Sequence, residues 1–340
     1  MTKATDVVQM DDELKALIEE IYGLMIARTE VLHDTSRTLV VKLETEQGTY
    51  LLKSIYVSEA RVRFMLDCEQ FLRGRGIRIP AIRKARGDQL FFSWKWKHYV
   101  LQEWIAAVPW AKSPEEMAVL MAGLAGQVHF RSKSYRPDEE ETDNGLLLWE
   151  REYEDVQAFL ARWREEGTSV KKKNRKAVRK QLDFFLAAAG EVQERLTTRL
   201  SDCALHGALT PVISHNDFHT KNVLITAQHE AYLIDWEFVR LDGPSRDLNR
   251  ILHSLIKKTA EWNADVFERI KDAYMAEHPL SEEELRFVYL DLAFPHNLYR
   301  YLYWKRFDRM PLERVQCILE AEAAKTAYFL QEARISCHDS

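Results

Sequence analysis

Residues 212–247 decide the fold, and they read VISHNDFHTKNVLITAQHEAYLIDWEFVRLDGPSRD. An apolar strand leads into a loop that carries Asp217, and Asn222 follows five residues later. A hairpin over 223–234 then delivers Asp235 after a short apolar run. Two carboxylates and one carboxamide thus stand at the ends of short strands, where hairpin geometry is expected to bring them close together.

These three side chains have the chemistry that phosphoryl transfer on magnesium requires. One carboxylate can orient an acceptor hydroxyl and take its proton, while an amide oxygen and a second carboxylate hold Mg²⁺, a hard ion that prefers oxygen ligands. Any one of the three alone would be an ordinary turn or hairpin residue, because Asp and Asn favour turns. The three together at this spacing indicate a catalytic site instead.

The region before this stretch has the pattern of an antiparallel sheet with one inserted helix. Apolar, β-branched and aromatic runs alternate with turn residues, and the first turn falls at Gly48. The predicted elements are a helix within the first 25 residues, strands over 37–44, 49–55, 89–94 and 98–104, and a helix over 58–72.

Helices dominate after Pro109. The run Ser113-Pro114-Glu115-Glu116 is a typical helix start, with a capping serine, a proline in the first turn and a glutamate three residues after the cap. We therefore predict an α+β fold with two lobes. The sheet-rich N-lobe spans 1–104, and the helical C-lobe spans 105–340, with a catalytic loop at 212–236 and a charged helical segment at 138–200.

The motif His215-x-Asp217, Asn222 and Ile234-Asp235-Trp236 resembles the catalytic loop and metal-binding aspartate of the aminoglycoside phosphotransferase and choline kinase superfamily, which has a protein-kinase-like fold. The resemblance covers about residues 30–330. Within the superfamily it is closest to the CotS-like spore-coat proteins of endospore-forming bacteria. The segments that carry this finer likeness are Gly48–Lys53, Asp242–Leu248 and Tyr289–His296.

The resemblance implies an ATP- and Mg²⁺-dependent phosphotransferase that acts on a hydroxyl of a small molecule. In that case Asp217 would be the catalytic base, and Asn222 and Asp235 the metal ligands. His215 and Asp247 would brace the catalytic loop from behind. ATP would lie between the lobes.

A lysine and a glutamate in the N-lobe complete the expected nucleotide site. Lys53 lies on a predicted strand and Glu69 on the inward face of the predicted helix, so we expect them to pair and to place the α- and β-phosphates. The alternative is a snorkelling lysine and a glutamate at the rim. The end of the last strand resembles the hinge whose backbone, at Glu103 and Ile105, meets adenine.

Two features depart from the protein-kinase pattern. No glycine-rich loop precedes Lys53, and the loop expected to cover the phosphates is His33–Arg37, where Thr35 and Ser36 could contact them. Only eleven residues separate Asp235 from Asp247, too few for an activation segment that docks a peptide. This short spacing favours a small-molecule acceptor over a protein.

The composition excludes several other classes. With 48 basic and 53 acidic residues the net charge is −5, which argues against nucleic acid as the main partner. No run approaches the roughly 18 apolar residues of a membrane span, and no secretory signal is evident, so we expect no membrane partner. The four cysteines, Cys68, Cys203, Cys317 and Cys337, match no zinc or disulfide pattern and are expected to be reduced thiols. The expected location is the cytoplasm of the mother cell, with assembly into the spore coat as a further destination.

Other interpretations remain open. The chain could be a structural coat protein that keeps the fold with little or no activity and binds other coat proteins. It could also be an aminoglycoside resistance enzyme, which would need an anionic pocket. The basic run 171–180 is interpreted as a solvated helix end, with contact to an anionic partner as the alternative. The aromatic residues between Tyr299 and Phe307 could form core or line the acceptor pocket.

Overall fold

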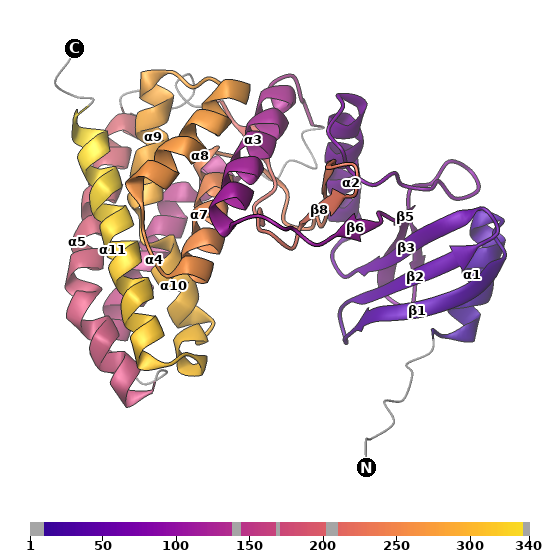
Figure 1. The fold of residues 1–340 in the computed structure, drawn as a ribbon, viewed down its shortest axis with the longest axis horizontal. Helices are drawn as coiled ribbons and strands as arrows, with labels where there is room; N and C mark the ends of the chain where they lie inside the picture. The colour runs from indigo at the N-terminus through magenta and orange to yellow at the C-terminus, as the bar shows by residue number, and fades with distance from the viewer. Residues whose placement is uncertain (1–9, 138–143, 168–170, 202–209, 336–340) are drawn as a thin grey trace. The chain divides into compact units, whose positions relative to one another are not determined.

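The computed structural model describes residues 10–137, 144–167, 171–201 and 210–335, which fall into two units. The first unit holds residues 10–109, Pro137 and the segment 222–237, and the second unit holds the remaining described residues. Figure 1 shows the sheet of the first unit in indigo and the helices of the second in magenta to yellow. The α+β class is therefore as predicted, and the hairpin after Asn222 belongs to the sheet-containing unit.

A five-stranded antiparallel sheet forms the base of the first unit, in the order β1-β2-β3-β5-β4. The β2–β3 turn contains Gly48 at a φ of 129°, a conformation that favours glycine. Lys53 of β3 stands opposite Val40 and Val100, in the middle of the sheet. The strands are β1 (Ile26–Asp34), β2 (Leu39–Thr45), β3 (Gly48–Ile55), β4 (Phe92–Trp94) and β5 (Lys97–Glu103).

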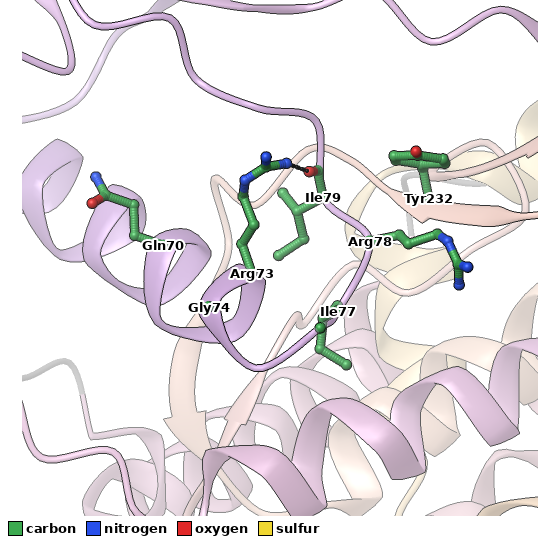
Figure 2. Close-up of a pocket in the computed structure, with 8 residues that line it drawn as sticks. Gln70, Arg73, Gly74, Ile77, Arg78, Ile79 and Tyr232 are labelled. Atoms are coloured by element: carbon green, nitrogen blue, oxygen red, sulfur yellow. Dashed lines mark hydrogen bonds between the residues drawn. The ribbon is translucent and has the colours of Figure 1, made fainter.

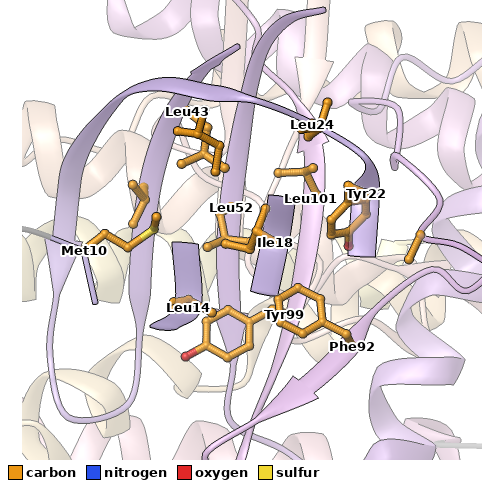
Figure 3. Packing of buried hydrophobic residues seen from close by; sticks show 13 residues of the cluster. Met10, Leu14, Ile18, Tyr22, Leu24, Leu43, Leu52, Phe92, Tyr99 and Leu101 are labelled. Carbon is orange, nitrogen blue, oxygen red and sulfur yellow. The ribbon is translucent and has the colours of Figure 1, made fainter. Parts of the chain in front are cut away.

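Helix α1 (Asp12–Tyr22) supplies one side of the core of this unit. Asp11 caps its first turn, and Leu14 and Ile18 are fully buried against the sheet residues Leu52 and Leu101, as Figure 3 shows. Burying each such side chain contributes roughly 1.5–3 kcal/mol. The helix predicted near the N-terminus therefore has a clear function, because it covers one face of the sheet.

Helix α2 (Glu59–Gly74) is the inserted helix, and Ser58 caps it by accepting from the N–H of Arg61. Its buried face includes Glu69 among apolar residues such as Val62 and Leu72.

A second, three-stranded sheet in the first unit carries the hairpin that follows Asn222. Its order is β6-β8-β9, and the N–H of Leu233 in β9 also donates to the carbonyl of Arg78 at 2.9 Å. The strands are β6 (Ala107–Val108), β8 (Val223–Thr226) and β9 (Ala231–Leu233).

The second unit is a set of packed helices with one two-stranded sheet, β10 paired antiparallel with β7. Helices α3 and α8 approach closely at Gly126, where an added Cβ would lie 2.7 Å from the carbonyl oxygen of Tyr274. The capping box at Ser113 is present as predicted. The elements are α3 (Pro114–Ser132), η2 (Gly145–Leu148), α4 (Trp149–Glu166), α5 (Lys172–Ser201), β7 (Val212–Ser214), β10 (Arg240–Asp242), α7 (Ser245–Thr259), α8 (Ala264–Glu277), α9 (Glu282–Ala293), α10 (His296–Tyr303), η3 (Arg306–Arg309) and α11 (Leu312–Ile335).

The two later segments with the finer likeness meet in the core of this unit. The hydroxyl of Ser245 donates to Asp291 at 2.5 Å, and Arg246 lies 3.7 Å from the same carboxylate. Burial alone would raise the pKa of Asp291, but Arg246 and His296 hold it well below its usual range. A buried, fully partnered carboxylate therefore joins α7 to α9.

Three other sequence features can be compared with the structure. The basic run opens α5, where Lys172, Lys173 and Lys176 are exposed while Asn174 is buried and donates to the carbonyl of Phe307 at 2.7 Å. Within the described ranges, no helix combines the length and apolar character needed to cross a membrane. Cys68 is buried and Cys317 is exposed, whereas Cys203 and Cys337 lie outside the described residues.

Candidate active site

The hairpin of β8 and β9 holds Asn222 and Asp235 at neighbouring positions. Asn222 directly precedes β8, and Asp235 follows β9 by two residues. The N–H of Ile234 donates to the carbonyl of Asn222 at 3.0 Å, so the ladder continues to both strand ends. Asn222 is buried, and Asp235 has a φ of 68°, which is uncommon for a residue with a side chain. The backbone therefore fixes the two predicted metal ligands next to each other.

Lys53 is the centre of an ion-pair cluster in the first unit. Its ammonium lies 2.6 Å from Oδ1 of Asp235 and 2.8 Å from Oε1 of Glu237. Burial alone would lower the pKa of Lys53, but the charges of the two carboxylates and their hydrogen bonds raise it above its ordinary value. One cation and two carboxylates leave a net negative charge, which suits a divalent cation.

Glu237 is a member of this cluster that the sequence reasoning did not assign. It follows Asp235 by two residues, but Asp235 has a φ of 68° and Glu237 lies in a turn, so the alternation of an extended strand does not apply here. The spacing in the sequence therefore gives no signal that identifies Glu237. Arg61 of α2 also donates to the backbone carbonyl of Glu237 at 2.9 Å, so the segment is held to the helix.

Lys53 and Glu69 were predicted to pair directly, and this prediction is wrong. The structure shows no ion pair between these two described residues. The carboxylate of Glu69 accepts a hydrogen bond from Gln102 at 3.2 Å, while Lys53 is occupied by Asp235 and Glu237. Burial raises the pKa of Glu69 to about 8, and the charge of Lys53 only partly offsets this. The physical reason for the difference is that the hairpin presents two accessible carboxylates to the ammonium, whereas burial favours a neutral Glu69.

The end of β5 carries the two residues predicted to meet adenine. The N–H of Glu103 donates to the carbonyl of Ala81 at 2.8 Å, and its carboxylate accepts from the N–H of Ala81 at 3.3 Å. The backbone of Glu103 could therefore meet a base only through its carbonyl. Ile105 is 8% exposed, so its side chain is part of the apolar interior of the unit.

The connection expected to cover the phosphates starts later than predicted. His33 belongs to β1, and the turn to β2 spans 35–38. Thr35 donates its N–H to the carbonyl of Thr38 at 2.9 Å, and its hydroxyl accepts from the N–H of Thr38 at 3.0 Å. These groups stabilise the turn itself, in which Thr35, Ser36 and Arg37 are exposed.

In the second unit, Asp247 fixes the loop that carries Asp217. Its carboxylate accepts from the N–H of His215 at 2.8 Å and from that of Asn216 at 2.7 Å. His129 of α3 lies 3.0 Å from the same carboxylate. Burial alone would raise the pKa of Asp247, but the hydrogen bond and charge of His129, with those of His215, hold it below its ordinary value. Asp247 is thus an ionised anchor for the loop, and His129 is a supporting residue that sequence reasoning missed.

The carboxylate of Asp217 belongs to a residue that lines a pocket of about 560 Å³. It contacts the guanidinium of Arg250, and its Oδ2 lies 3.3 Å from Nε2 of His219. The pocket is formed by the loop after β7 together with α7, α10 and η3, all within the second unit. Trp304 lines it while Tyr301 and Phe307 are buried, so the aromatic cluster contributes both to the pocket and to the core.

A second pocket, of about 490 Å³, lies in the first unit at the C-terminal end of α2 (Figure 2). Figure 2 shows Arg73 donating to the carbonyl of Ile79, at 2.8 Å, and Tyr232 of β9 on another side. The described residues that line it include none of those predicted for the site.

The structure thus gathers the predicted residues into two groups. The first group, in the first unit, contains Asn222, Asp235 and Lys53. Glu69 is close enough to Lys53 for the lysine charge to lower the pKa of Glu69 against the effect of burial. The second group, in the other unit, contains Asp217 with its braces His215 and Asp247.

The donor set fits a magnesium ion. A carboxamide and a carboxylate are hard oxygen donors, and Mg²⁺ usually takes only one or two carboxylates because substrate phosphates and waters complete its coordination. Among the described residues, no group of three or more His, Cys, Asp or Glu could hold a metal ion by itself. Asn222 and Asp235 therefore supply two oxygen donors, and other ligands would have to complete the coordination of an ion there.

Comparison with known proteins places these features in a family. A family model described as the phosphotransferase enzyme family matches residues 28–282. Spore coat protein S of Bacillus subtilis (strain 168) is 23% identical over 292 residues, which cover 84% of this chain and 82% of that protein.

Two solved structures share the fold. An aminoglycoside phosphotransferase from Alicyclobacillus acidocaldarius has a TM-score of 0.71 and 16% identity, and the match covers 98% of both chains. A spectinomycin phosphotransferase, solved in complex with ADP and spectinomycin, has a TM-score of 0.61 and 15% identity over 94% of this chain and 98% of the other. The predicted kinase-like fold, a sheet-based N-lobe and a helical C-lobe, is confirmed.

Proposed function

Because the chain belongs to the phosphotransferase enzyme family, we propose that it transfers a phosphoryl group from ATP to a hydroxyl group of a small molecule. The observation that carries the proposal is that one short stretch of chain supplies a carboxylate to each of two sites. Asp217 opens into a ligand-sized pocket, and Asp235 pairs with Lys53 at 2.6 Å. Only four residues separate Asp217 from Asn222 in the sequence.

The residues have distinct roles in this reaction. Asp217 accepts the proton of the acceptor hydroxyl, and general-base assistance of this kind typically contributes about 10²–10⁴-fold. Asp247 and His215 hold the loop so that the carboxylate is fixed before the acceptor arrives. Lys53 carries the positive charge for the nucleotide phosphates, with Asp235 and Glu237 holding its ammonium in place.

The nucleotide is proposed to be ATP with Mg²⁺. When bound, the ion neutralises charge on the phosphates, and Asn222 and Asp235 would hold it. The carbonyl of Glu103 and the backbone of Ile105 are proposed to meet adenine. Glu69 would act on the lysine through its charge alone, because its carboxylate accepts a hydrogen bond from Gln102 and none from the Lys53 ammonium.

A second candidate function is a structural one. The similarity to spore coat protein S supports a coat protein that keeps the kinase fold with little or no activity. Under either function, we propose that the protein acts in the cytoplasm of a sporulating mother cell and that coat proteins are its macromolecular partners. Against a purely structural role, the partly buried Lys53 cluster and the loop of Asp217 that Asp247 holds in place have no evident use in a scaffold.

Thermal unfolding with and without Mg-ATP separates the two functions. A ligand that binds only the folded state stabilises it by about 2.7 kcal/mol at about 100 times its Kd, which raises Tm by several degrees. We expect millimolar Mg-ATP to raise Tm of the wild type, and ATP with excess chelator to do so less. No shift at millimolar Mg-ATP would reject the phosphotransferase and leave the scaffold.

A further inference from the structure

The pocket beside Asp217 has six lysine and arginine residues among its fourteen lining residues. They come from separate parts of the chain that the helices of the second unit bring together. Among the described residues that line the pocket, Asp217 supplies the only carboxylate. The cationic residues are Lys221 of the loop, Arg250, Lys257 and Lys258 of α7, Arg300 of α10 and Arg306 of η3.

The cations are close enough to repel one another. Burial, followed by the charges of Arg300 and Arg306, lowers the pKa of Arg250 to about 9. Burial, then Arg246 and Arg306, lowers that of Arg300 to about 10, although Glu152 and Asp291 partly offset this. Both guanidinium groups remain charged at neutral pH. The pocket therefore holds positive charge that its own carboxylate does not balance.

Several residues that line the pocket also carry buried polar atoms without a partner among the described residues. Nε of Arg250, Nη1 of Arg300 and both ring nitrogens of His253 have no hydrogen-bond partner among the described residues. A buried polar group without a partner costs about 1–3 kcal/mol, so native proteins rarely leave several together. A ligand that brings acceptor oxygens would satisfy the guanidinium donors and relieve the mutual repulsion of the cations. Burial lowers the pKa of His253 well below its ordinary value, so its neutral ring offers only one N–H to such a ligand.

The shape of the pocket suits a small organic molecule. Its volume of about 560 Å³ lies within the usual range for ligand sites. Phe238 and Trp304 line it with side chains that are largely exposed, at 59% and 62%. Such aromatic faces can pack against the carbon skeleton of a ligand whose polar groups reach the arginines.

We propose that the phosphoryl acceptor is an anionic alcohol, whose oxyanion group, a phosphate or carboxylate, binds Arg300 and Arg306 while its hydroxyl faces Asp217. The inference rests on the proposed function, because it names the substrate class of the same site. Planar guanidinium groups bind such oxyanions in a bidentate manner, which gives both affinity and orientation. A polycation such as an aminoglycoside would meet repulsion here, so the resistance-enzyme interpretation has no support in the pocket.

The binding test uses inorganic phosphate as the probe, titrated calorimetrically into the protein saturated with Mg-AMP-PNP. We expect saturable binding that weakens about 10-fold or more in Arg300→Gln and in Arg306→Gln, with Mg-AMP-PNP affinity changed by less than about twofold. Arg306 lies on the partly exposed η3, so its variant remains informative if Arg300→Gln does not fold. Arg309→Gln on the same 3-10 turn removes an equal charge outside the pocket and should leave phosphate binding unchanged.

Other outcomes overturn the inference in identifiable ways. Absence of phosphate binding to the nucleotide-loaded wild type would reject it, as would tighter binding of choline or spectinomycin than of phosphate. Equal weakening of phosphate and Mg-AMP-PNP in the arginine variants would assign the cluster to the nucleotide instead. Failure of Mg-AMP-PNP itself to bind would reject the proposed function, which is a separate result.

An activity test then compares matched acceptors, namely glycerol, glycerol 3-phosphate, glycerate and choline, by release of ADP. We expect kcat/KM to be about 10-fold or more higher for an anionic alcohol than for the neutral one, with no turnover of choline. Arg306→Gln should raise KM for that anion more than it lowers kcat. Preferred turnover of the neutral or cationic alcohol would contradict the inference while leaving the phosphotransferase function intact.

Discussion

Asp217 and Arg250 are in direct contact in the second unit, in a pocket that five further lysine and arginine residues also line. The guanidinium meets Oδ1 of Asp217, while Oδ2 lies 3.3 Å from Nε2 of His219. The pair fixes the orientation of the carboxylate, which is what a general base needs before its substrate arrives. It also places a positive charge directly beside the proposed position of the acceptor.

The Lys53 cluster predicts a selective loss of nucleotide affinity. Lys53→Met removes the cation that Asp235 and Glu237 hold, so Mg-ATP affinity measured by calorimetry should fall by about 10-fold or more. Lys42→Met is the matched control, since Lys42 lies on the adjacent strand and pairs with the surface residue Glu44 at 3.2 Å. Equal affinity of the two variants would show that Lys53 does not serve the nucleotide.

Burial of Glu69 predicts a pH-dependent stability. The folded protein keeps the proton up to a pKa of about 8, while the unfolded chain releases it near the ordinary glutamate pKa of 4.5. The stabilisation is therefore complete below 4.5 and is lost as pH rises towards about 8. Relative to Glu69→Gln, the wild type should lose roughly 1 kcal/mol per pH unit across this window.

Denaturant unfolding of wild type and Glu69→Gln at pH 5, 6.5 and 8 measures this difference. The exposed Glu46 on the β2–β3 turn supplies the control variant Glu46→Gln. Its free energy of unfolding, plotted against pH, should run parallel to that of the wild type. Parallel curves for Glu69→Gln as well would show that the buried carboxyl does not hold its proton.

Two helix glycines of the second unit should respond oppositely to alanine. At Gly126 a Cβ would lie 2.7 Å from the carbonyl oxygen of Tyr274, so Gly126→Ala should destabilise by about 1–3 kcal/mol. At Gly190 of α5 a Cβ meets nothing within 4 Å, so Gly190→Ala should be neutral or stabilise by up to about 1 kcal/mol. Chemical denaturation measures the free energy of unfolding of both variants. If Gly126→Ala is as stable as Gly190→Ala, α3 and α8 do not approach as closely at Gly126 as the 2.7 Å separation implies.

Much of the fold could be predicted because its elements have strong local patterns. The β2–β3 hairpin alternates around Gly48, and α3 begins at a complete capping box. Strand β1 was missed because it is an edge strand whose side chains are mostly exposed, with charged residues such as Arg28 and Glu30 along it. Strand β10 has only three residues, which is too short for an alternation of apolar and polar side chains to be recognised in the sequence.

The site could be predicted only where its residues are close in sequence. The loop after β7 and the hairpin after Asn222 carry a recognisable spacing, whereas Arg250 and Arg300 are fifty residues apart and meet through helix packing. The pairing of Lys53 was predicted with the wrong carboxylate because sequence alone does not show which acidic group stays ionised. Burial decides that, and it favours a neutral Glu69.

The measurement that tests the central claim most directly is acceptor-dependent ADP release by Asp217→Asn, together with its Mg-ATP affinity. We expect turnover to fall by about 10²–10⁴-fold while nucleotide affinity changes by less than about twofold. Asp183→Asn, at an exposed position of α5, is the control and should match the wild type. Wild-type turnover in Asp217→Asn would contradict the assignment of Asp217 as the base and, with it, the proposed site.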